Sequence, residues 1–303
     1  MEIDAPTIPR VRPTTARPRG RWLRDLFALT KPGVTRMCAL TTAGGAWLAP
    51  GFEWSPAIAG VIGASLAVAS ASAFNMWWER ASDPLMARTR NRPLAAERLA
   101  PETAFAFAGL LGTASLATLA LFTNPLTTGL AALAIILYVL VYTPLKMRTP
   151  LALVIGAVPG AAPPLLGWTA ITGTLDPGGL ALFAILLVWQ MPHFLAITLY
   201  RKQEFARAGI RCVPVVRGDQ AAKLQAIAWS LALVPASILP ALLGVCGVVY
   251  GASALVISLA FLAWTLTGLW AAKPAVWARS LFFASLLYLP LLIAALTIDA
   301  LFW

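Results

Sequence analysis

Of the 303 residues in the chain, 59% are hydrophobic and only 12% are charged, and the mean hydropathy is +0.78. A soluble domain this apolar would lack the polar residues to cover its surface, so the composition excludes an ordinary soluble protein and favours a polytopic membrane protein. The formal charge of +11 does not indicate nucleic-acid binding, because the basic residues lie in loops between apolar segments. The three cysteines have no CxxC spacing, and they indicate neither a disulfide framework nor a zinc site.

The first 30 residues are rich in arginine and proline and contain no apolar core followed by a small-residue cleavage site. This pattern does not predict a secretory signal. Glu2, Asp4 and the scattered prolines also disfavour the acid-poor amphipathic helix of a mitochondrial transit peptide. We expect residues 1–30 to form a disordered basic tail on the cytoplasmic side and residues 31–303 to form a single transmembrane domain.

Nine apolar segments have about the length that a lipid bilayer requires. Every lysine and arginine lies in the tail, at the start of the first segment, or around the loops that follow the second, fourth, sixth and eighth segments. With nine crossings these positions share one side of the membrane, and the positive-inside rule assigns that side to the cytoplasm. We therefore predict an all-α protein with a cytoplasmic N-terminus and nine transmembrane helices near residues 34–49, 56–74, 102–122, 126–143, 151–170, 178–200, 222–246, 250–271 and 279–300.

Polar chemistry is concentrated directly after the second apolar segment, in residues 74–94. Asn75, Glu79 and Asp83 are spaced at i, i+4 and i+8, which on a helix places three oxygen-bearing side chains on nearly the same face. Carboxylate and amide oxygens are the ligands that Mg²⁺ prefers, and Mg²⁺ commonly shares them with substrate phosphates. The spacing predicts a magnesium site, with Pro84 stopping or turning the helix at its end.

Three arginines follow at once, at positions 88, 90 and 92. A guanidinium group matches the geometry of phosphate oxygens, so the arginines favour a diphosphate next to the metal. The alternative for this segment on its own is an ordinary solvated loop after an apolar helix. A second acidic cluster on the same membrane face favours the metal–diphosphate interpretation.

The second cluster follows the sixth apolar segment. Glu204 is the carboxylate nearest the membrane there, and Arg201, Lys202 and Arg207 flank it. Because the two clusters begin four helices apart, the chain is consistent with two related four-helix halves and an added ninth helix. A pocket shared by both clusters would hold two metal ions bridging one diphosphate. Such an arrangement supports ionisation of an allylic diphosphate by stabilising the charge on the leaving group.

Two further features are open to more than one interpretation. The fifth segment is rich in glycine, alanine and proline over residues 156–168, which indicates either close helix packing or a kink that opens a pocket. His193, the only histidine, follows Pro192 inside the sixth segment. An ionisable residue within a span is costly and often functional, so His193 is either a ligand for a haem iron or a hydrogen-bonded structural residue.

Several motifs resemble those of the UbiA-type intramembrane prenyltransferases, and among these the branch that farnesylates haem. The resemblance covers most of the chain from Thr30 onward. Glu79 and Glu204 stand where that family has aspartates, and Met147, Arg211 and Cys212 replace commoner residues. The matching residues are Asn75, Glu79 and Asp83; Arg88, Thr89, Arg92, Pro93 and Leu94; Tyr142, Thr143, Lys146, Arg148, Thr149 and Pro150; residues 160–170; Trp189, Pro192, His193 and Phe194; and Glu204, Phe205, Ala208, Gly209, Ile210 and residues 214–216.

The resemblance implies a UbiA-type helical bundle that transfers a farnesyl group from farnesyl diphosphate to a vinyl group of haem b, giving haem o for haem–copper oxidases. It implies Mg²⁺ held by Asn75, Glu79, Asp83 and Glu204. The implied diphosphate ligands are Arg88, Arg92, Lys146 and Arg148, with Arg201 and Lys202 beside them. Under this resemblance, His193 is expected to bind the haem.

The expected setting is a bacterial inner membrane, with the active site facing the cytoplasm and membrane lipid around the bundle. A haem A synthase or an oxidase is the expected recipient of haem o, and no nucleic acid is expected. One alternative is prenyl transfer to a quinone precursor or another aromatic acceptor. A more remote alternative is a small-molecule transporter, but transporters place ionisable residues near the membrane midplane, whereas the acids here cluster at one face.

Overall fold

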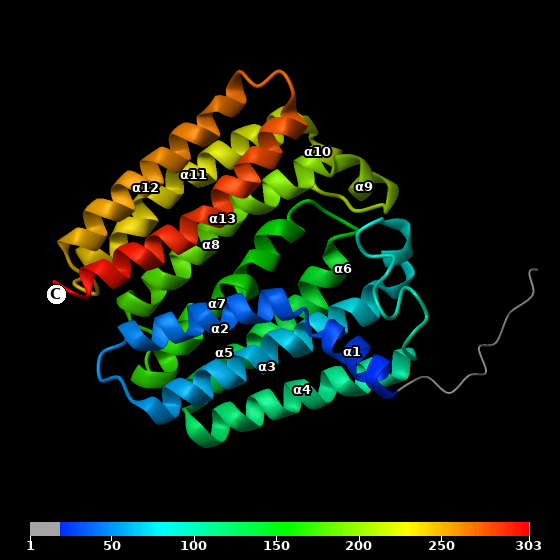
Figure 1. Cartoon of the computed structure of the whole chain (residues 1–303), viewed down its shortest axis with the longest axis horizontal. Coiled ribbons are helices and arrows are strands. Elements are labelled where there is room, and N and C mark those ends of the chain that lie inside the picture. The colour runs from blue at the N-terminus through cyan, green and yellow to red at the C-terminus, as the bar shows by residue number, and fades with distance from the viewer. Residues whose placement is uncertain (1–18, 303) are drawn as a thin grey trace, which may run out of the picture.

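The computed structural model describes residues 19–302, and in that part of the chain every regular element is helical. Long helices run up and down through the molecule, joined by short loops (Figure 1). The α-helices are α1 (Arg19–Leu29), α2 (Pro32–Leu48), α3 (Trp54–Trp78), α4 (Pro101–Phe122), α5 (Pro125–Ile136), α6 (Thr143–Leu145), α7 (Ala152–Thr172), α8 (Pro177–Tyr200), α9 (Lys202–Arg207), α10 (Val213–Val216), α11 (Gly218–Leu242), α12 (Val248–Leu266) and α13 (Pro274–Asp299).

Shorter helical pieces complete several of these elements. A π-helix, η3 (Leu137–Tyr142), joins α5 to α6, so that Pro125–Leu145 forms one continuous rod. Three 3₁₀ turns lie at the ends of longer helices: η1 (Glu79–Ala81), η2 (Asp83–Leu85) and η4 (Thr267–Leu269).

Eight helices in the described residues are long and apolar enough to cross a membrane. They coincide to within a few residues with eight of the nine segments expected from the sequence. The remaining expected segment corresponds to α2, which has 17 residues. The molecule is therefore a multi-helix membrane protein, as its composition predicts.

Part of the expected disordered tail is helical. Residues 19–29 form α1, which buries Leu26 and Leu29 against α3 and α4. An ion pair between Asp25 and Arg98 of the 86–99 loop holds the same helix, with Arg98 Nε 3.0 Å from Asp25 Oδ1. Composition alone did not reveal this helix, because its few apolar residues are spaced to cover a surface rather than to cross a bilayer. Residues 1–18 of the expected tail lie outside the described part.

Small residues of α7 allow a close approach to α2. A Cβ added to Gly45 would collide with the carbonyl oxygen of Pro164, and one added to Gly167 would collide with the carbonyl oxygen of Thr42. These contacts support the packing interpretation of the glycine-rich fifth segment. The same helix also lines a large cavity through Gly156, Gly160 and five other residues, so packing and pocket formation occur together.

The molecule divides into two packed halves that meet where α7 lies against α8 (Figure 1). Buried residues of α8, α11, α12 and α13 form one core, and α1, α3 and α4 form another. The cationic loops of both halves lie at one end of the bundle, where the loop after α3, the α6–α7 connection, α9 and α10 come together (Figure 1). This end carries most of the residues that the sequence marks as functional.

Candidate active site

The first acidic motif is not one continuous α-helix. Helix α3 ends at Trp78, so Asn75 lies in its last turn, whereas Glu79 and Asp83 begin separate 3₁₀ turns. The expectation that all three share one helix is wrong. Pro84 provides the physical reason, because a continuous helix would bring its ring against the carbonyl of Arg80. The resulting turns are tight, and Ser82 N and Oγ both donate to Glu79 O, at 2.9 and 3.1 Å.

Asn75 is buried at the centre of a hydrogen-bond network. Its Oδ1 accepts from Lys31 Nζ at 2.9 Å, and its Nδ2 donates to Thr143 Oγ1 at 3.3 Å. Thr143 in turn donates to the Tyr138 carbonyl at 2.8 Å. The network ties together the starts of α2 and α6 and the end of α3. Asn75 is thereby fixed in orientation before any ligand binds.

From the sequence, Lys31 is expected near the lipid headgroups and not in the site. It precedes α2 with a left-handed backbone conformation (φ 48°), and its side chain lines the same cavity as Asn75 and Glu79. Burial, and next the positive charge of Arg92, lower the pKa of Lys31 to about 7. A poorly neutralised ammonium group in such a place favours binding of an anion.

Glu79 and Asp83 share one cationic partner. Arg92 Nη1 lies 2.8 Å from Asp83 Oδ1 and 3.6 Å from Glu79 Oε2, and Glu79 also pairs with Lys146. The Asp83 side chain is only 1% exposed. Burial raises the pKa of Asp83, and the charge of Arg92 opposes that rise. The carboxylates therefore face each other across a single guanidinium group.

Two adjoining cavities open around this cluster. The larger, called here the inner cavity, has a volume of about 410 Å³ and runs between α2, α3, the α5–α6 rod, α7 and α8. The smaller, the outer cavity, has a volume of about 190 Å³ and extends toward the end of α8 and the 205–213 segment. The residues that line both are Glu79, Arg88, Arg92, Tyr142, Lys146, Leu153 and Phe194.

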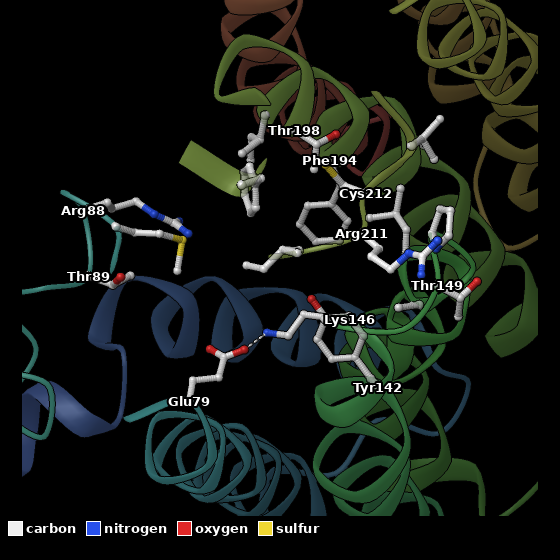
Figure 2. Close-up of a pocket in the computed structure, with 18 of the residues that line it drawn as sticks. Glu79, Arg88, Thr89, Tyr142, Lys146, Thr149, Phe194, Thr198, Arg211 and Cys212 are labelled. Atoms are coloured by element: carbon white, nitrogen blue, oxygen red, sulfur yellow. Dashed lines mark ion pairs between the residues drawn. The ribbon is translucent and has the colours of Figure 1, made fainter. Parts of the chain in front are cut away.

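Figure 2 shows the outer cavity with the Glu79–Lys146 ion pair at its base. Arg88 lies on one side of that pair and Arg211 on the other, while Phe194 and Thr198 of α8 form part of the opposite wall. Residues from the two motif-bearing loops thus meet at one cavity, although more than a hundred positions separate them in the sequence.

The second acidic cluster is more exposed than the first. Glu204 pairs with its neighbour Arg201 at 3.2 Å, and its side chain is 30% exposed. Lys202 pairs with Asp219 at 2.7 Å. Glu204 lies within electrostatic reach of Arg88 but lines neither cavity, whereas the next residue, Phe205, lines the outer one. The predicted residues that line neither cavity are Asp83, Arg148, His193, Arg201, Lys202 and Glu204.

No group of three or more His, Cys, Asp or Glu side chains is arranged to hold a metal ion between residues 19 and 302. The donors that converge on Arg92 nevertheless suit Mg²⁺, since Glu79 and Asp83 supply hard carboxylate oxygens and Asn75 an amide oxygen nearby. These residues would suit one magnesium ion, which would compete with Arg92 for the two carboxylates. Glu204 lines neither cavity, so it would join this set only if the loop that carries it moved toward Glu79.

His193 lies between α8 and α13. Its ring stacks on Trp189 and contacts Phe282, with centroid distances of 5.1 and 5.0 Å. Its Nδ1 is 2.8 Å from Ser285 Oγ, and that hydroxyl donates its proton to the Phe282 carbonyl at 2.6 Å. Because a hydroxyl has only one proton, Nδ1 must be the donor in the first bond. The Nε2 lone pair is then left available to accept a proton or bind a metal.

Several cavity residues were missed because their role depends on backbone geometry. The π-helix η3 brings Tyr138 and Tyr142 to the inner cavity, with ring centroids 5.0 Å apart. Segments of π-helix are frequent at functional sites, but hydrophobic periodicity does not reveal them. Gln190 also reaches the inner cavity, where Nε2 donates to the Ala157 carbonyl at 2.8 Å. Tyr142 belongs to one of the matching motifs, but the resemblance implies no role for it.

Known proteins resemble this chain in sequence or in fold. A protoheme IX farnesyltransferase from Myxococcus xanthus (strain DK1622) is 46% identical over 276 residues, which cover 91% of this chain and 94% of that protein. A solved structure of digeranylgeranylglyceryl phosphate synthase superposes with a TM-score of 0.79 at 16% identity, covering 93% of this chain and all of the other.

A UbiA homolog from Archaeoglobus fulgidus, solved with GPP and Mg²⁺ bound, superposes with a TM-score of 0.62 at 19% identity over 90% of this chain and 99% of the other. The sequence model of the UbiA prenyltransferase family matches residues 38–287, a range that includes most of the residues of both cavities. This chain therefore belongs to the UbiA prenyltransferase family.

Proposed function

We propose that this protein transfers the farnesyl group of farnesyl diphosphate to a vinyl group of haem b, giving haem o and diphosphate. The observation that carries the proposal is the inner cavity, which leads from the Glu79–Arg92–Lys146 cluster into an apolar interior. The relative from Myxococcus xanthus bears the name of this activity. The reaction breaks the C1–O bond of farnesyl diphosphate, joins C1 to the vinyl carbon, and adds water to the resulting cation with loss of a proton.

The inner cavity suits a prenyl diphosphate because its two ends differ. Small and aliphatic side chains of α3, α5 and α7 form its apolar wall, where a farnesyl chain would be shielded from water. Its polar end carries Lys31, Arg88, Arg92 and Lys146, which supply positive charge for the diphosphate. Arg148, Arg201 and Lys202 are proposed as further diphosphate ligands on the basis of their charge and their position in the adjoining loops.

Mg²⁺ is the proposed cofactor, held by Asn75, Glu79 and Asp83, with Glu204 as the fourth proposed ligand. When bound, the ion would offset the negative charge that develops on the leaving diphosphate. The protein residues orient the substrate: Lys146 and Arg92 bind the carboxylates in its absence and are positioned to bind phosphate oxygens in its presence. The UbiA homolog that holds GPP and Mg²⁺ supports this cofactor.

His193 is the proposed haem-binding residue. The hydrogen bond from Nδ1 to Ser285 favours a neutral ring with a free Nε2, which is the form that binds haem iron. The ring lies in the α8–α13 contact rather than in either cavity, but the next residue, Phe194, lines both, so His193 would bind a haem held at the edge of the outer cavity.

The proposed topology has nine spans, with α2 as the first, and a cytoplasmic N-terminus in a bacterial inner membrane. The clustering of the cationic loops at one end of the bundle supports it (Figure 1). Haem o released from the site would pass to a haem A synthase or an oxidase.

The test is an assay of the purified protein in lipid nanodiscs with farnesyl diphosphate, Mg²⁺ and either haem b or 4-hydroxybenzoate. We expect mass spectrometry to detect haem with one added farnesyl group and one added hydroxyl group, and no prenylated benzoate. Formation of prenylated benzoate alone would favour the quinone-precursor alternative. The absence of both products, with uptake of a small solute in vesicles, would favour a transporter.

A further inference from the structure

The outer cavity has an excess of positive charge that the first carboxylate motif does not neutralise. Arg88, Arg92, Lys146 and Arg211 line it, and Glu79 is its only acidic residue in the described chain. Glu79 already pairs with Lys146 and Arg92. Neither of the other two arginines forms an ion pair with a carboxylate between residues 19 and 302. The cavity is therefore suited to an anionic ligand.

Arg211 is held at the rim by its own backbone. Its N–H donates to the Lys146 carbonyl at 3.1 Å, which fixes the 205–213 segment against the α6–α7 connection. Gly209, with a positive φ of 71°, makes the turn that precedes it. The side chain is exposed and lies near Thr149, across the cavity from Arg88 (Figure 2). Arg211 lines only the outer cavity and is not among the residues of the inner cavity, where the diphosphate is proposed to bind.

Most of the remaining lining of the outer cavity is apolar. Phe194, Ile197, Leu153, Phe205 and Ile210 line it beneath the charged rim. A ligand that matches both parts has an apolar body and acidic groups at one edge. Haem b has this distribution, since its two propionates lie on neighbouring pyrrole rings and its vinyl groups on the other two.

We propose that Arg211 binds a propionate of the haem acceptor at the rim of the outer cavity, so that the vinyl-bearing edge points toward the junction with the inner cavity. This inference rests on the proposed function and identifies the acceptor's anchoring group. Since the cavity volume is about 190 Å³, it receives one edge of the macrocycle while the remainder lies outside. Arg211 does not line the inner cavity, where the bond to the diphosphate is proposed to break, so it adds affinity rather than performing a step of the reaction.

The experiment compares wild type with Arg211→Gln, using haem b and haem b dimethyl ester as acceptors. The substitution preserves the backbone N–H and removes only the charge. We expect KM for haem b to rise about three- to ten-fold, the range for loss of one partly exposed charge-assisted hydrogen bond. With the dimethyl ester, whose propionates are uncharged, wild type and variant should have equal KM values. Arg211→Lys should recover most of the affinity for haem b.

Arg207→Gln is the matched control, because Arg207 is also exposed in the second loop but does not line the cavity. Titration of haem b followed by its Soret absorbance, without farnesyl diphosphate, gives a second measurement that needs no catalysis. An equal effect of Arg211→Gln on both acceptors would overturn the proposal, as would a rise in KM for farnesyl diphosphate instead of haem. If wild type itself fails to convert haem b, the proposed function fails, which is a distinct outcome.

Discussion

The two acidic loops of this protein look alike in sequence but differ in structure. In the first, Asp83 is almost completely buried and shares Arg92 with Glu79. In the second, Glu204 is partly exposed and pairs only with Arg201, three residues away. The first loop is packed into the helical bundle, whereas the second lies at the surface beside the outer cavity. The difference indicates that the two carboxylate groups do not contribute equally to the site.

The energetic consequence follows from desolvation. A buried charge that loses its partner costs about 3–5 kcal/mol, because water does not replace the lost contact. A surface ion pair contributes about 0–1 kcal/mol. Substitutions in the first loop should therefore affect both folding and activity, while those in the second should act mainly on ligand binding.

The largest effect is expected from Arg92→Gln. The change leaves the buried Asp83 carboxylate without its cation and removes one of the two partners of Glu79. We expect a destabilisation of about 3–5 kcal/mol and a loss of nearly all farnesyl transfer. Thermal unfolding in detergent, together with the haem assay, measures both. The control is Arg90→Gln, an exposed position in the same loop, and equal melting temperatures for the two variants would contradict the expectation.

The next-largest effect is expected when matched substitutions in the two loops are compared. Glu79→Gln should lower kcat by about 10²–10³-fold, the range for removing one group that stabilises charge in a transition state. It should also raise the Mg²⁺ concentration needed for half-maximal rate. Glu204→Gln should lower kcat by less than about ten-fold, as expected for a partly exposed carboxylate. If both variants lose activity and Mg²⁺ affinity equally, the two loops act as equivalent metal ligands, and the asymmetry described here does not extend to the loaded enzyme.

Much of this architecture was predictable because a bilayer imposes strong rules. Span length, loop charge and the absence of acids from the inner segments all follow from the cost of polar groups in lipid. The meeting of Glu79, Asp83 and Arg92 at one end of the bundle was also predictable, since all three follow the same apolar helix; their roles as metal and diphosphate ligands stay predictions. The spacing could not reveal that Pro84 and the turn at Ser82 would divide Glu79 from Asp83.

Residues contributed by distant elements were harder to predict. Lys31 approaches Asn75 only because α2 packs beside α3, and nothing in the local sequence around Lys31 marks that contact. Similarly, the π-helical turn that brings Tyr138 toward the cavity arises from a one-residue change in hydrogen bonding. Arg211 was noted only as a departure from a motif. Its place at the rim depends on the backbone bond to Lys146.

Lys31 provides a smaller, pH-dependent test of the first loop's environment. Its pKa near 7 means that the ammonium form predominates below pH 7 and is lost as the pH rises. If that form binds the diphosphate, binding at pH 8 must take up a proton, and KM for farnesyl diphosphate should rise about five-fold between pH 7 and 8. Lys31→Met should have a higher KM that changes little over this range. The same pH dependence in both proteins would exclude Lys31 as its cause.

The smallest expected effect concerns Cys212, which lines the outer cavity beside Arg211. Burial raises the pKa of this thiol, so the reactive thiolate forms only above the ordinary value of about 8.5. In a Cys38→Ser/Cys246→Ser background, alkylation by iodoacetamide at pH 7.5, followed by mass spectrometry, should be several-fold slower than that of a free cysteine peptide, on the order of the lost thiolate fraction.

Haem b should slow the alkylation of Cys212 further, because the proposed acceptor edge covers the 205–213 segment. Farnesyl diphosphate should slow it less than haem b does, because its chain lies toward α2 and α3 and only its diphosphate reaches the shared residues Arg88 and Lys146. Protection by farnesyl diphosphate but not by haem would reverse the assignment of the two cavities. The buried first loop would then not bind the diphosphate, and the exposed second loop would not contact the haem.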